Sequence, residues 1–199
     1  LNVRRNYKDG KEDGPSELFD EDGQLKEKGN HKNGIRDGLW ESYHKNGQLK
    51  ERKNYKHGVL EGLREEWYYG NNQLKQKHNY KNGKEDGPFE TYFRNGQIQF
   101  KGNNKNGEYD GFYEKFDENG NLLKSRKWKD GKSLSRSEFE YYENGQLKEK
   151  ENYKDNNRDG LWESFRENGS LMSRTNYKDG KQDGLWEGYY ENGEVRQRI

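Results

Sequence analysis

The side chains in this chain that could do chemistry are mainly carboxylates that recur at fixed intervals. Asp9 and Asp13 flank a glycine-rich turn and could offer oxygen ligands to Ca²⁺, but their spacing does not fit an EF-hand loop, and aspartate beside glycine is ordinary turn composition. Glutamates of the Glu41 type could serve as general acids, yet they return in one stretch of sequence after another. Because catalysis needs one distinctive site, we interpret these carboxylates as structural.

Glycine pairs and histidines are the other candidates for chemistry. Gly29–Gly34 and Gly102–Gly107 have the glycine spacing of a phosphate-binding loop, but neither pair is followed by the lysine that such a loop needs. The four histidines show no close pair at metal-ligand spacing: His31, His44, His57 and His78. We therefore expect no catalytic residue, no cofactor and no metal site, and we predict that the chain is not an enzyme.

The bulk composition, taken alone, is typical of a disordered chain. Of the 199 residues, 25% are hydrophobic and 38% are charged. Aromatic residues nevertheless reach 14%, and they recur in a fixed phase. A repeat array needs fewer apolar residues than a globular domain, because each unit has only to cover its neighbours. We predict a folded array.

The charge balance restricts the class of partner. With 38 basic and 37 acidic residues, the net charge is +1, so no global field favours nucleic acid, and we expect no nucleic-acid partner. No apolar run approaches the length that spans a bilayer. Cysteine is absent, which excludes disulfides and thiolate chemistry.

The chain is built from variants of residues 32–55, which read KNGIRDGLWESYHKNGQLKERKNY. Each copy begins with lysine and the period is 24 or 25 residues, so we predict a single repeat array over residues 1–199. Because Leu1 enters partway through a repeat, we expect a trimmed or partial chain in which any targeting signal is missing. The units are 8–31, 32–55, 56–80, 81–104, 105–128, 129–153, 154–177 and 178–199, and residues 1–7 match the tail of a preceding unit.

Each unit predicts a loop, a strand, a hairpin and a return strand. Residues 32–38 hold two glycine turns, for which we expect a loop with left-handed backbone. The aromatic-rich stretch 39–43 favours a strand, and Asn46-Gly47 predicts a tight two-residue hairpin loop. The fold class is therefore all-β, with about eight hairpin repeats forming an elongated, twisted antiparallel sheet or rod.

The hairpin fixes a register that can be tested by charge. A two-residue loop at Asn46-Gly47 places Glu41 directly opposite Arg52, and opposite charges facing each other stabilise a sheet by about 0.2–1 kcal/mol per pair. The same pairing of opposite charges is predicted in four further units: Glu17–Lys28, Glu90–Lys101, Glu163–Arg174 and Glu187–Arg198. Two units lack it, because the facing residues there are Glu114–Ser125 and Phe139–Lys150.

Strand alternation then assigns side chains to the two faces of the sheet. It sends Trp40, Leu49 and Tyr55 to one face and Leu39 and Tyr43 to the other. Each face mixes apolar and charged groups, so we expect the aromatic rings to stack between successive hairpins.

Two units depart from the pattern. The third has one extra residue and carries Asn71-Asn72 where the others carry a pair ending in glycine, and because asparagine tolerates the left-handed region we expect the hairpin to survive. The sixth also has one extra residue, and residues 133–137 replace its Asp-Gly turn. These two units are candidates for special surface or bend points.

The spaced Tyr7, Gly10-Lys11 and Gly14 resemble a MORN (membrane occupation and recognition nexus) repeat. The fuller unit DGLWESYHKNGQLKERKNYKHG resembles the bacterial MORN variant of YwqK-type antitoxins. The resemblance implies stacked β-hairpin repeats, a scaffold or binding role and, in the YwqK-like branch, neutralisation of a toxin. Some lipid kinases carry MORN repeats beside a catalytic domain, but no kinase domain is visible here, so a kinase name would be inherited.

Two functions remain open. The first is a non-catalytic scaffold that binds a protein partner such as a toxin, and the second is a cell-surface or envelope module that binds glycan, choline-like groups or membrane. The first implies a cytoplasmic protein, and a signal sequence before Leu1 would imply the second; the oligomeric state is not predicted. Aromatic side chains on a rigid scaffold suit interaction hot spots, and the candidate partner-binding residues are Trp40, Tyr43, Trp67, Tyr92, Trp162, Trp186 and Tyr189.

Overall fold

The computed structural model describes residues 2–199, and this part of the chain is built from strands and turns with no helix. It follows that no helix within it could cross a bilayer. The strands are β1 (Val3–Lys8), β2 (Lys11–Phe19), β3 (Leu25–Lys32), β4 (Ile35–Arg36), β5 (Gly38–Tyr43), β6 (Leu49–Lys56), β7 (Val59–Leu60), β8 (Gly62–Trp67), β9 (Leu74–Lys81), β10 (Lys84–Tyr92), β11 (Ile98–Lys105), β12 (Glu108–Tyr109), β13 (Gly111–Phe116), β14 (Leu122–Lys129), β15 (Lys132–Tyr141), β16 (Leu147–Lys154), β17 (Asn157–Arg158), β18 (Gly160–Phe165), β19 (Leu171–Lys178), β20 (Lys181–Gln182), β21 (Glu187–Tyr189) and β22 (Val195–Arg198).

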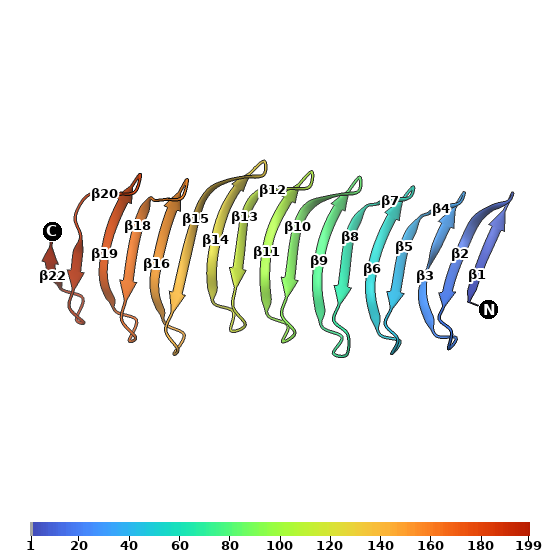
Figure 1. Cartoon of the computed structure of the whole chain (residues 1–199), viewed down its shortest axis with the longest axis horizontal. Coiled ribbons are helices and arrows are strands. Elements are labelled where there is room, and N and C mark those ends of the chain that lie inside the picture. Colours follow the sequence, from blue (N-terminus) through green and yellow to red (C-terminus); the bar gives the residue numbers. More distant parts are fainter. Residues whose placement is uncertain (1) are drawn as a thin grey trace. The chain divides into compact units, whose positions relative to one another are not determined.

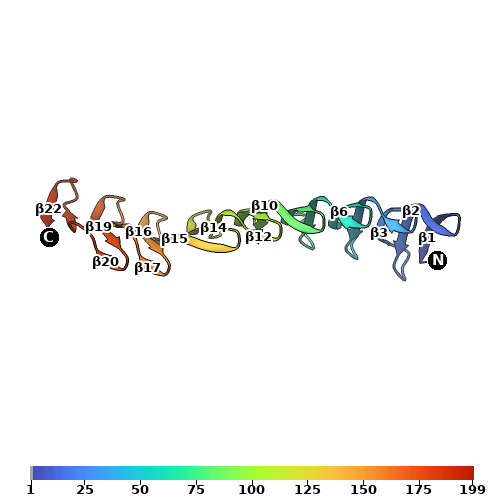
Figure 2. The same ribbon diagram turned by 90° about the horizontal axis from the view of Figure 1, so that it is seen from above.

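Contacts within the chain divide it into two units, an N-terminal unit that ends at Glu108 and a C-terminal unit that begins at Tyr109. In each unit, successive hairpins pair edge to edge in chain order into an open antiparallel sheet (Figure 1). Viewed from above, the strands of each unit form a single layer (Figure 2). The predicted all-β array of hairpins is confirmed.

The segment that opens each repeat is a tight turn, not the loop that the sequence predicted. Asn33 and Gly34 have φ of +52° and +86°, and a two-residue type I′ turn needs positive φ at both central positions. Strands β3 and β4 pair directly across them. Each turn also rests on the preceding one, because Gly34 N–H donates to the Glu12 carbonyl at 2.7 Å and Asn33 N–H donates to the Asp13 carboxylate at 3.1 Å.

The second glycine turn, Asp37-Gly38, is a bulge that separates β4 from β5. Gly38 has φ +76°, and Asp37 N–H donates to the Asn30 carbonyl at 2.9 Å. The Asp37 carboxylate accepts a hydrogen bond from His57 N–H, in the next turn, at 3.2 Å. Asp13, one of the two aspartates considered as calcium ligands from the sequence, likewise bonds to the backbone of the following repeat.

The hairpin at Asn46-Gly47 has a three-residue loop, so the predicted two-residue loop is wrong. His44 N–H donates to the Gln48 carbonyl at 2.8 Å, which leaves residues 45–47 in the loop. Gly47 has φ +77°, whereas Asn46 keeps a negative φ and uses its side-chain oxygen to accept Gln48 N–H at 3.1 Å. A type I′ turn is therefore excluded at this position, because it needs positive φ at two successive residues.

A one-residue bulge at Lys50 cancels the longer loop. Tyr43 pairs with Leu49 and Ser42 pairs with Glu51, so Lys50 has no partner across the strand. Beyond the bulge the predicted register is confirmed in every unit named above, exceptions included. The face predicted for Leu49 is wrong for the same reason: Leu49 is the direct partner of Tyr43, and directly opposite residues share a face.

The third unit absorbs its extra residue in the hairpin loop. Tyr68 N–H donates to the Gln73 carbonyl at 2.9 Å, and Asn72 adopts φ +53° where the other units have glycine. Glu65 still pairs with Arg52 on one side and Lys77 on the other. The prediction that this hairpin survives is confirmed.

The most buried ring of the N-terminal unit, Trp40, is 4% exposed and holds two hairpins together. It lies against Gly29, where a Cβ would come within 2.2 Å of the ring, and its Nε1–H donates to the Asn30 carbonyl at 3.1 Å. The Arg36 guanidinium lies 3.9 Å over the indole, and the edge of His31 meets it at 4.9 Å. We call the face that carries this ring, in either unit, the tryptophan face.

The C-terminal unit repeats this arrangement. Trp162 lies between Tyr153 and Tyr177, with ring centroids 5.4 and 5.2 Å away, and Arg158 covers it at 4.2 Å. Its Nε1–H donates to the Asn152 carbonyl at 2.9 Å. The predicted stacking of rings between successive hairpins is confirmed.

Candidate partner-binding surface

The face opposite the tryptophan face carries a row of directly paired charges, which we call the charge ladder. The paired glutamates and cations predicted inside each hairpin also pair between hairpins, so that the sign alternates at every strand of the N-terminal unit. The face that bears it is the ladder face. The ladder runs Arg4, Glu17, Lys28, Glu41, Arg52, Glu65, Lys77, Glu90 and Lys101.

Glu41 of the ladder contacts the cations on both neighbouring strands. Its carboxylate lies 3.1 Å from Lys28 Nζ and 3.0 Å from Arg52 Nη2, and it accepts a hydrogen bond from the Tyr43 hydroxyl at 2.9 Å. Lys28 Nζ also lies over the Tyr43 ring, 5.6 Å from its centroid. The same triad of cation, glutamate and aromatic ring recurs at Glu90 in this unit and at Glu187 in the C-terminal unit.

Electrostatics favour the charged forms of Glu41 and Lys28. Burial acts to raise the pKa of Glu41, but hydrogen bonds from Tyr43, Lys28 and Arg52 outweigh it and lower the pKa. The pKa of Lys28 is raised, chiefly by its hydrogen bonds to Tyr43 and Glu41. Both groups are therefore charged at neutral pH, and Glu41 holds no proton to donate.

The two signs of charge differ in depth. The Glu41 side chain is 13% exposed, whereas those of Lys28 and Arg52 are 46% and 41% exposed. The carboxylates are thus paired and largely covered, and the cations form the outer surface of this face. A ligand that approaches the ladder face meets positive charge first, although the whole chain is nearly neutral.

An apolar row runs beside the ladder on the same face. It consists of the residue two positions before each ladder glutamate, and these side chains project into solvent: Leu39 is 47% exposed and Leu63 41%. Pro15 and Pro88 occupy the same place in the hairpins on either side, and asparagines such as Asn54 pair with the row from the intervening strands. In the C-terminal unit the equivalent residues are Phe112, Leu161 and Leu185.

A groove of about 320 Å³ lies between neighbouring members of this row. Pro15 and Leu39 form two of its sides, Asn30 lies between them, and the charges Lys28 and Glu41 border it. Row members lie two strands apart, a spacing of about 9.6 Å for strands about 4.8 Å apart. The surface therefore presents, at regular intervals, an exposed apolar side chain of the row, which we call an apolar post, with a ladder cation beside it.

The structure separates the predicted partner-binding aromatics into two sets on opposite faces. Trp40, Trp162 and Trp186 lie on the tryptophan face of their units, and Tyr43, Trp67, Tyr92 and Tyr189 lie on the ladder face beneath cations. Trp40 at 4% and Tyr189 at 9% exposure have little surface left for a partner. Their partner-binding role stays a prediction, and the more exposed surface belongs to the aliphatic row and the ladder cations.

Sequence reasoning missed both the continuity of the ladder and the apolar row. The signal for the first was present, because a glutamate at one fixed position and a cation at another recur through the repeats. Pairing between hairpins depends on the bulges at Lys50 and Asp37-Gly38, which sequence patterns do not reveal. The row could have been found by asking which apolar residues alternate in phase with the ladder glutamates.

Within residues 2–199, no group of three or more histidine, aspartate or glutamate side chains is arranged so that it could hold a metal ion. His31 Nδ1 lies 3.1 Å from the Glu12 carboxylate, within one repeat, and His78 Nδ1 lies 3.2 Å from the Glu85 carboxylate of the following repeat. His31 instead packs edge-on against Trp40, with ring centroids 4.9 Å apart.

The sixth unit interrupts the ladder in the C-terminal unit. On one side of β15, the residue that pairs with the ladder position Ser125 of β14 is Ser137. On the other side, the residue that pairs with the ladder position Lys150 of β16 is Phe139. The ladder position is therefore offset by two residues within β15. From Lys150 onward the alternation resumes with Glu163, Arg174, Glu187 and Arg198.

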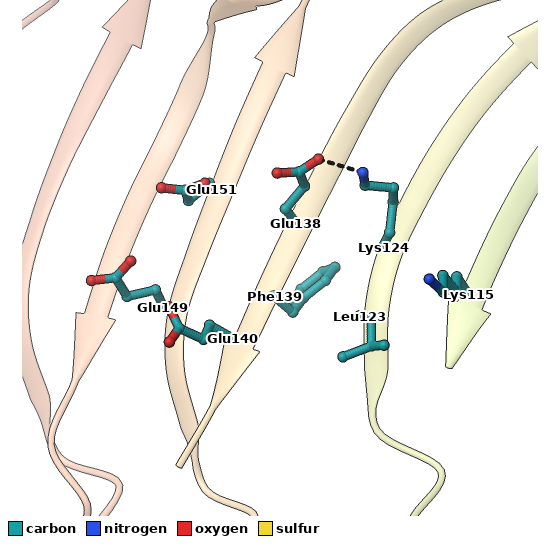
Figure 3. A pocket seen from close by; sticks show the side chains of 8 residues that line it. All are labelled: Lys115, Leu123, Lys124, Glu138, Phe139, Glu140, Glu149 and Glu151. Carbon is teal, nitrogen blue, oxygen red and sulfur yellow. Dashed lines mark ion pairs between the residues drawn. The ribbon is translucent and has the colours of Figure 1, made fainter. Parts of the chain in front are cut away.

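The offset gathers like charges on the tryptophan face. Glu138 lies directly opposite Glu151 and Glu140 opposite Glu149, around a hollow of about 340 Å³ (Figure 3). The ion pair of Lys124 with Glu138, 2.6 Å long, is visible there, and Lys148 pairs with Glu140 at 2.7 Å. These cations reduce a repulsion that directly opposed glutamates would otherwise exert on the hairpin.

The comparisons with known proteins concern the repeats and two large assemblies. The model of the MORN repeat variant matches residues 12–33, 36–57, 62–82, 85–106, 137–155, 158–179 and 182–199. The longest stretch without a match, 107–136, holds the fifth hairpin and the start of the offset strand β15. No curated protein matches the chain significantly.

Among solved structures, the chain is similar to part of the Photorhabdus luminescens Tc holotoxin pore with a mutated TccC3, at 12% identity and a TM-score of 0.25, over 99% of this chain and 13% of that one. It is also similar to part of TcdB2-TccC3-TEV, at 12% identity and a TM-score of 0.22, over 97% of this chain and 14% of that one. TM-scores this low establish neither a shared fold nor a shared function.

Proposed function

Because the chain belongs to the MORN repeat variant family, we propose that it is a non-catalytic repeat scaffold that binds a protein partner along its ladder face. The observation that carries the proposal is the apolar row beside the outward-facing ladder cations. Leu39 and Leu63 project into solvent from a rigid sheet, and Lys28 and Arg52 flank them. A regular pattern of exposed apolar and charged side chains is typical of an interaction surface.

The chemistry of the surface describes its partner. An acidic side chain can pair with a ladder cation whose own glutamate lies deeper, and an apolar side chain can enter the groove between Pro15 and Leu39. The partner is therefore a protein segment that combines acidic and apolar residues. Nucleic acid fits less well, because apolar posts interrupt the cations and the chain has no basic excess.

The specific partner we propose is a toxin that the scaffold neutralises, and the protein is then cytoplasmic. This step is supported by the resemblance of the repeat to YwqK-type antitoxins. A glycan-, choline- or membrane-binding module is the alternative. The N-terminal part of the row favours a protein, because its members are leucine and proline, which do not stack on sugars as exposed aromatic rings do.

The experiment compares matched surface variants of the whole chain. Leu39→Ser with Leu63→Ser removes two exposed posts, and Ile35→Ser with Val59→Ser removes two equally exposed apolar residues outside the row. The product of the adjacent gene is co-expressed with each form, and complex formation and host growth are measured. We expect the first pair of changes to abolish the complex and the protection, and the second pair to preserve both.

Two results would refute the proposal at different levels. If the gene neighbour does not bind but another identified protein does so through the leucines, the scaffold role holds and the toxin assignment fails. If the wild-type chain binds a glycan array or choline resin and no identified protein, the protein-binding scaffold itself is rejected.

A further inference from the structure

The C-terminal unit contains an arginine without an acidic partner. Arg126 of β14 lies directly opposite Arg136 of β15, and its Nε is buried without a hydrogen bond. No carboxylate in residues 2–199 lies within ion-pair distance of its guanidinium. Like charges placed directly opposite each other destabilise a sheet, and an unsatisfied buried donor adds to that cost.

The neighbouring arginine is held by contacts of its Nε, its Nη1 and the face of its guanidinium. Arg136 donates from Nε to Glu138 at 3.1 Å and from Nη1 to the Asn156 side chain at 2.8 Å, and it lies 3.9 Å over the Tyr153 ring. Those contacts fix the position of Arg136 and keep its charge beside Arg126.

In the N-terminal unit, a comparable pair of cations shares one carboxylate. Lys53 and Arg64 each lie 2.7 Å from the Glu51 carboxylate, which therefore neutralises both. Burial acts to raise the pKa of Glu51, but the hydrogen bonds from Lys53 and Arg64 outweigh it and lower the pKa. No carboxylate takes that role between Arg126 and Arg136 in the described part of the chain.

A pocket of about 280 Å³ lies at the arginine pair. Its lining consists of Arg126, Ser133, Ser135, Arg136, Tyr153, Asp155 and Asn156. The pocket thus brings two guanidinium groups and two serine hydroxyls to one place, together with one carboxylate, that of Asp155. Its volume exceeds that of several waters at about 30 Å³ each. Trp128, two residues along β14 on the same face as Arg126, also has a buried Nε1–H without a hydrogen bond.

From this geometry we propose that the Arg126–Arg136 pocket binds a phosphate group. Guanidinium groups match phosphate geometry with paired hydrogen bonds, and the phosphate supplies the negative charge that Glu51 supplies in the N-terminal unit. A phosphate offers more acceptor oxygens than a carboxylate, which suits a site with two arginines and two serines. The site arises from the offset of β15 and so does not recur in the other repeats.

The test titrates the full chain with inorganic phosphate, followed by NMR of the arginine side chains and by calorimetry. Arg126→Gln removes the charge, and Arg196→Gln removes an exposed arginine elsewhere in the same unit as the matched control. We expect Arg126→Gln to weaken phosphate binding at least about tenfold, since a charge-assisted hydrogen bond is lost, and Arg196→Gln to leave it unchanged.

A melting experiment separates binding from folding. In phosphate-free buffer Arg126→Gln should melt at the same temperature as the wild type or higher, because it removes one of two opposed charges. Added phosphate should raise the melting temperature of the wild type and not that of the variant. Acetate at the same ionic strength should raise neither.

Vesicles of phosphatidylcholine with and without phosphatidic acid distinguish a free phosphate from a lipid headgroup. Binding of inorganic phosphate that depends on Arg126 assigns the site to a soluble phosphate, and binding only to phosphatidic acid vesicles that depends on Arg126 assigns it to a headgroup. The proposal is overturned if neither binds, if acetate binds as well as phosphate, or if Arg126→Gln binds as the wild type does.

Discussion

The third and sixth repeats each carry one extra residue, and the outcomes differ because the residues enter different parts of the hairpin. In the third, the extra residue lies in the loop that Tyr68 and Gln73 close, and Glu65 keeps both ladder partners. In the sixth, it lies in the strand that has lost its Asp-Gly bulge, and the ladder position moves from Ser137 to Phe139. An extra residue in a loop leaves the pairing of the strands unchanged. An extra residue in a paired strand shifts the register between that strand and its neighbour.

The difference shows that the bulges determine the register in which the strands of this array pair. In regular repeats the Asp37-Gly38 bulge and the Lys50 bulge set the phase in which neighbouring hairpins meet. Where the first is missing, cation meets cation at Arg126 and Arg136, and carboxylate meets carboxylate at Glu140 and Glu149. The regular repeats form a surface of alternating charge, whereas in the offset repeat like charges face each other directly across neighbouring strands.

The largest expected effect tests what holds regular hairpins together. Trp40→Ala should cost about 3–5 kcal/mol, because it removes a ring that is 4% exposed between two hairpins. Leu39→Ala, at the adjacent but exposed position, should cost less than about 0.5 kcal/mol. Hydrogen exchange of β3 and β5 measures both. Equal losses of protection would show that the Trp40 ring is not the main contact between the two hairpins. The offset repeat has Glu138 on this face, and it would then lose no stability for want of a buried ring there.

The next effect concerns the glycine beneath that ring. Gly29→Ala should cost about 1–3 kcal/mol, since the new Cβ would lie 2.2 Å from the Trp40 ring and force it to move. In a Trp40→Ala background the same change should cost much less, because the atoms it would strike are gone. Urea unfolding of the four forms gives the coupling. Additive costs would contradict the close packing of Gly29 on Trp40.

The hairpins could be predicted from the sequence because their signals are local. Alternating residues and turn glycines gave the strands, and the charge match of Glu41 with Arg52 gave a register that the structure confirms. The turn types could not be assigned in the same way. Asn33-Gly34 and Asn46-Gly47 are the same dipeptide, yet only the first has positive φ at both residues, because the bulge at Lys50 and the Gln48 backbone select a longer loop for the second.

The candidate surface was harder to predict because it depends on how hairpins meet one another. Sequence spacing identified the aromatic residues as candidates, but Trp40 is consumed in packing and Tyr43 lies beneath Lys28. The exposed positions, such as Leu39, differ from the buried ones only in the face on which they lie. Likewise, nothing local in the sequence around Arg126 indicates that it faces Arg136, since that pairing follows from the offset strand.

A charge reversal sharpens the comparison between the repeats with a smaller effect. Glu149→Lys should stabilise the β15–β16 hairpin by about 0.2–1 kcal/mol, because it turns a repulsive pair with Glu140 into an attractive one. Glu51→Lys, the equivalent change in the second repeat, should destabilise, because Glu51 bonds Lys53 and Arg64. Local hydrogen exchange gives the sign of each. Two effects of the same sign would mean that the like charges around Glu149 do not matter.

The smallest effect is confined to the last hairpin and depends on pH. Hydrogen bonds from Tyr189 and Arg174, and then Arg198, hold the pKa of Glu187 at about 2, below its ordinary value of 4.5. A carboxyl whose pKa is lower in the folded than in the unfolded state stabilises above the unfolded pKa, and that contribution is lost as the pH falls toward the folded pKa. Exchange protection of β21 and β22 should therefore be constant above about pH 4.5 and decline between there and pH 2.

Glu187→Gln separates this titration from general acid unfolding. The amide keeps the size of the side chain and removes its charge, so the variant should lose protection in β21 and β22 already at neutral pH and show little further change as the pH falls. Phe139 occupies the ladder position of β15, so no carboxylate there can contribute the same titration. If the wild type and Glu187→Gln declined in parallel between pH 4.5 and 2, the carboxylate of the ladder would contribute nothing to pairing between hairpins.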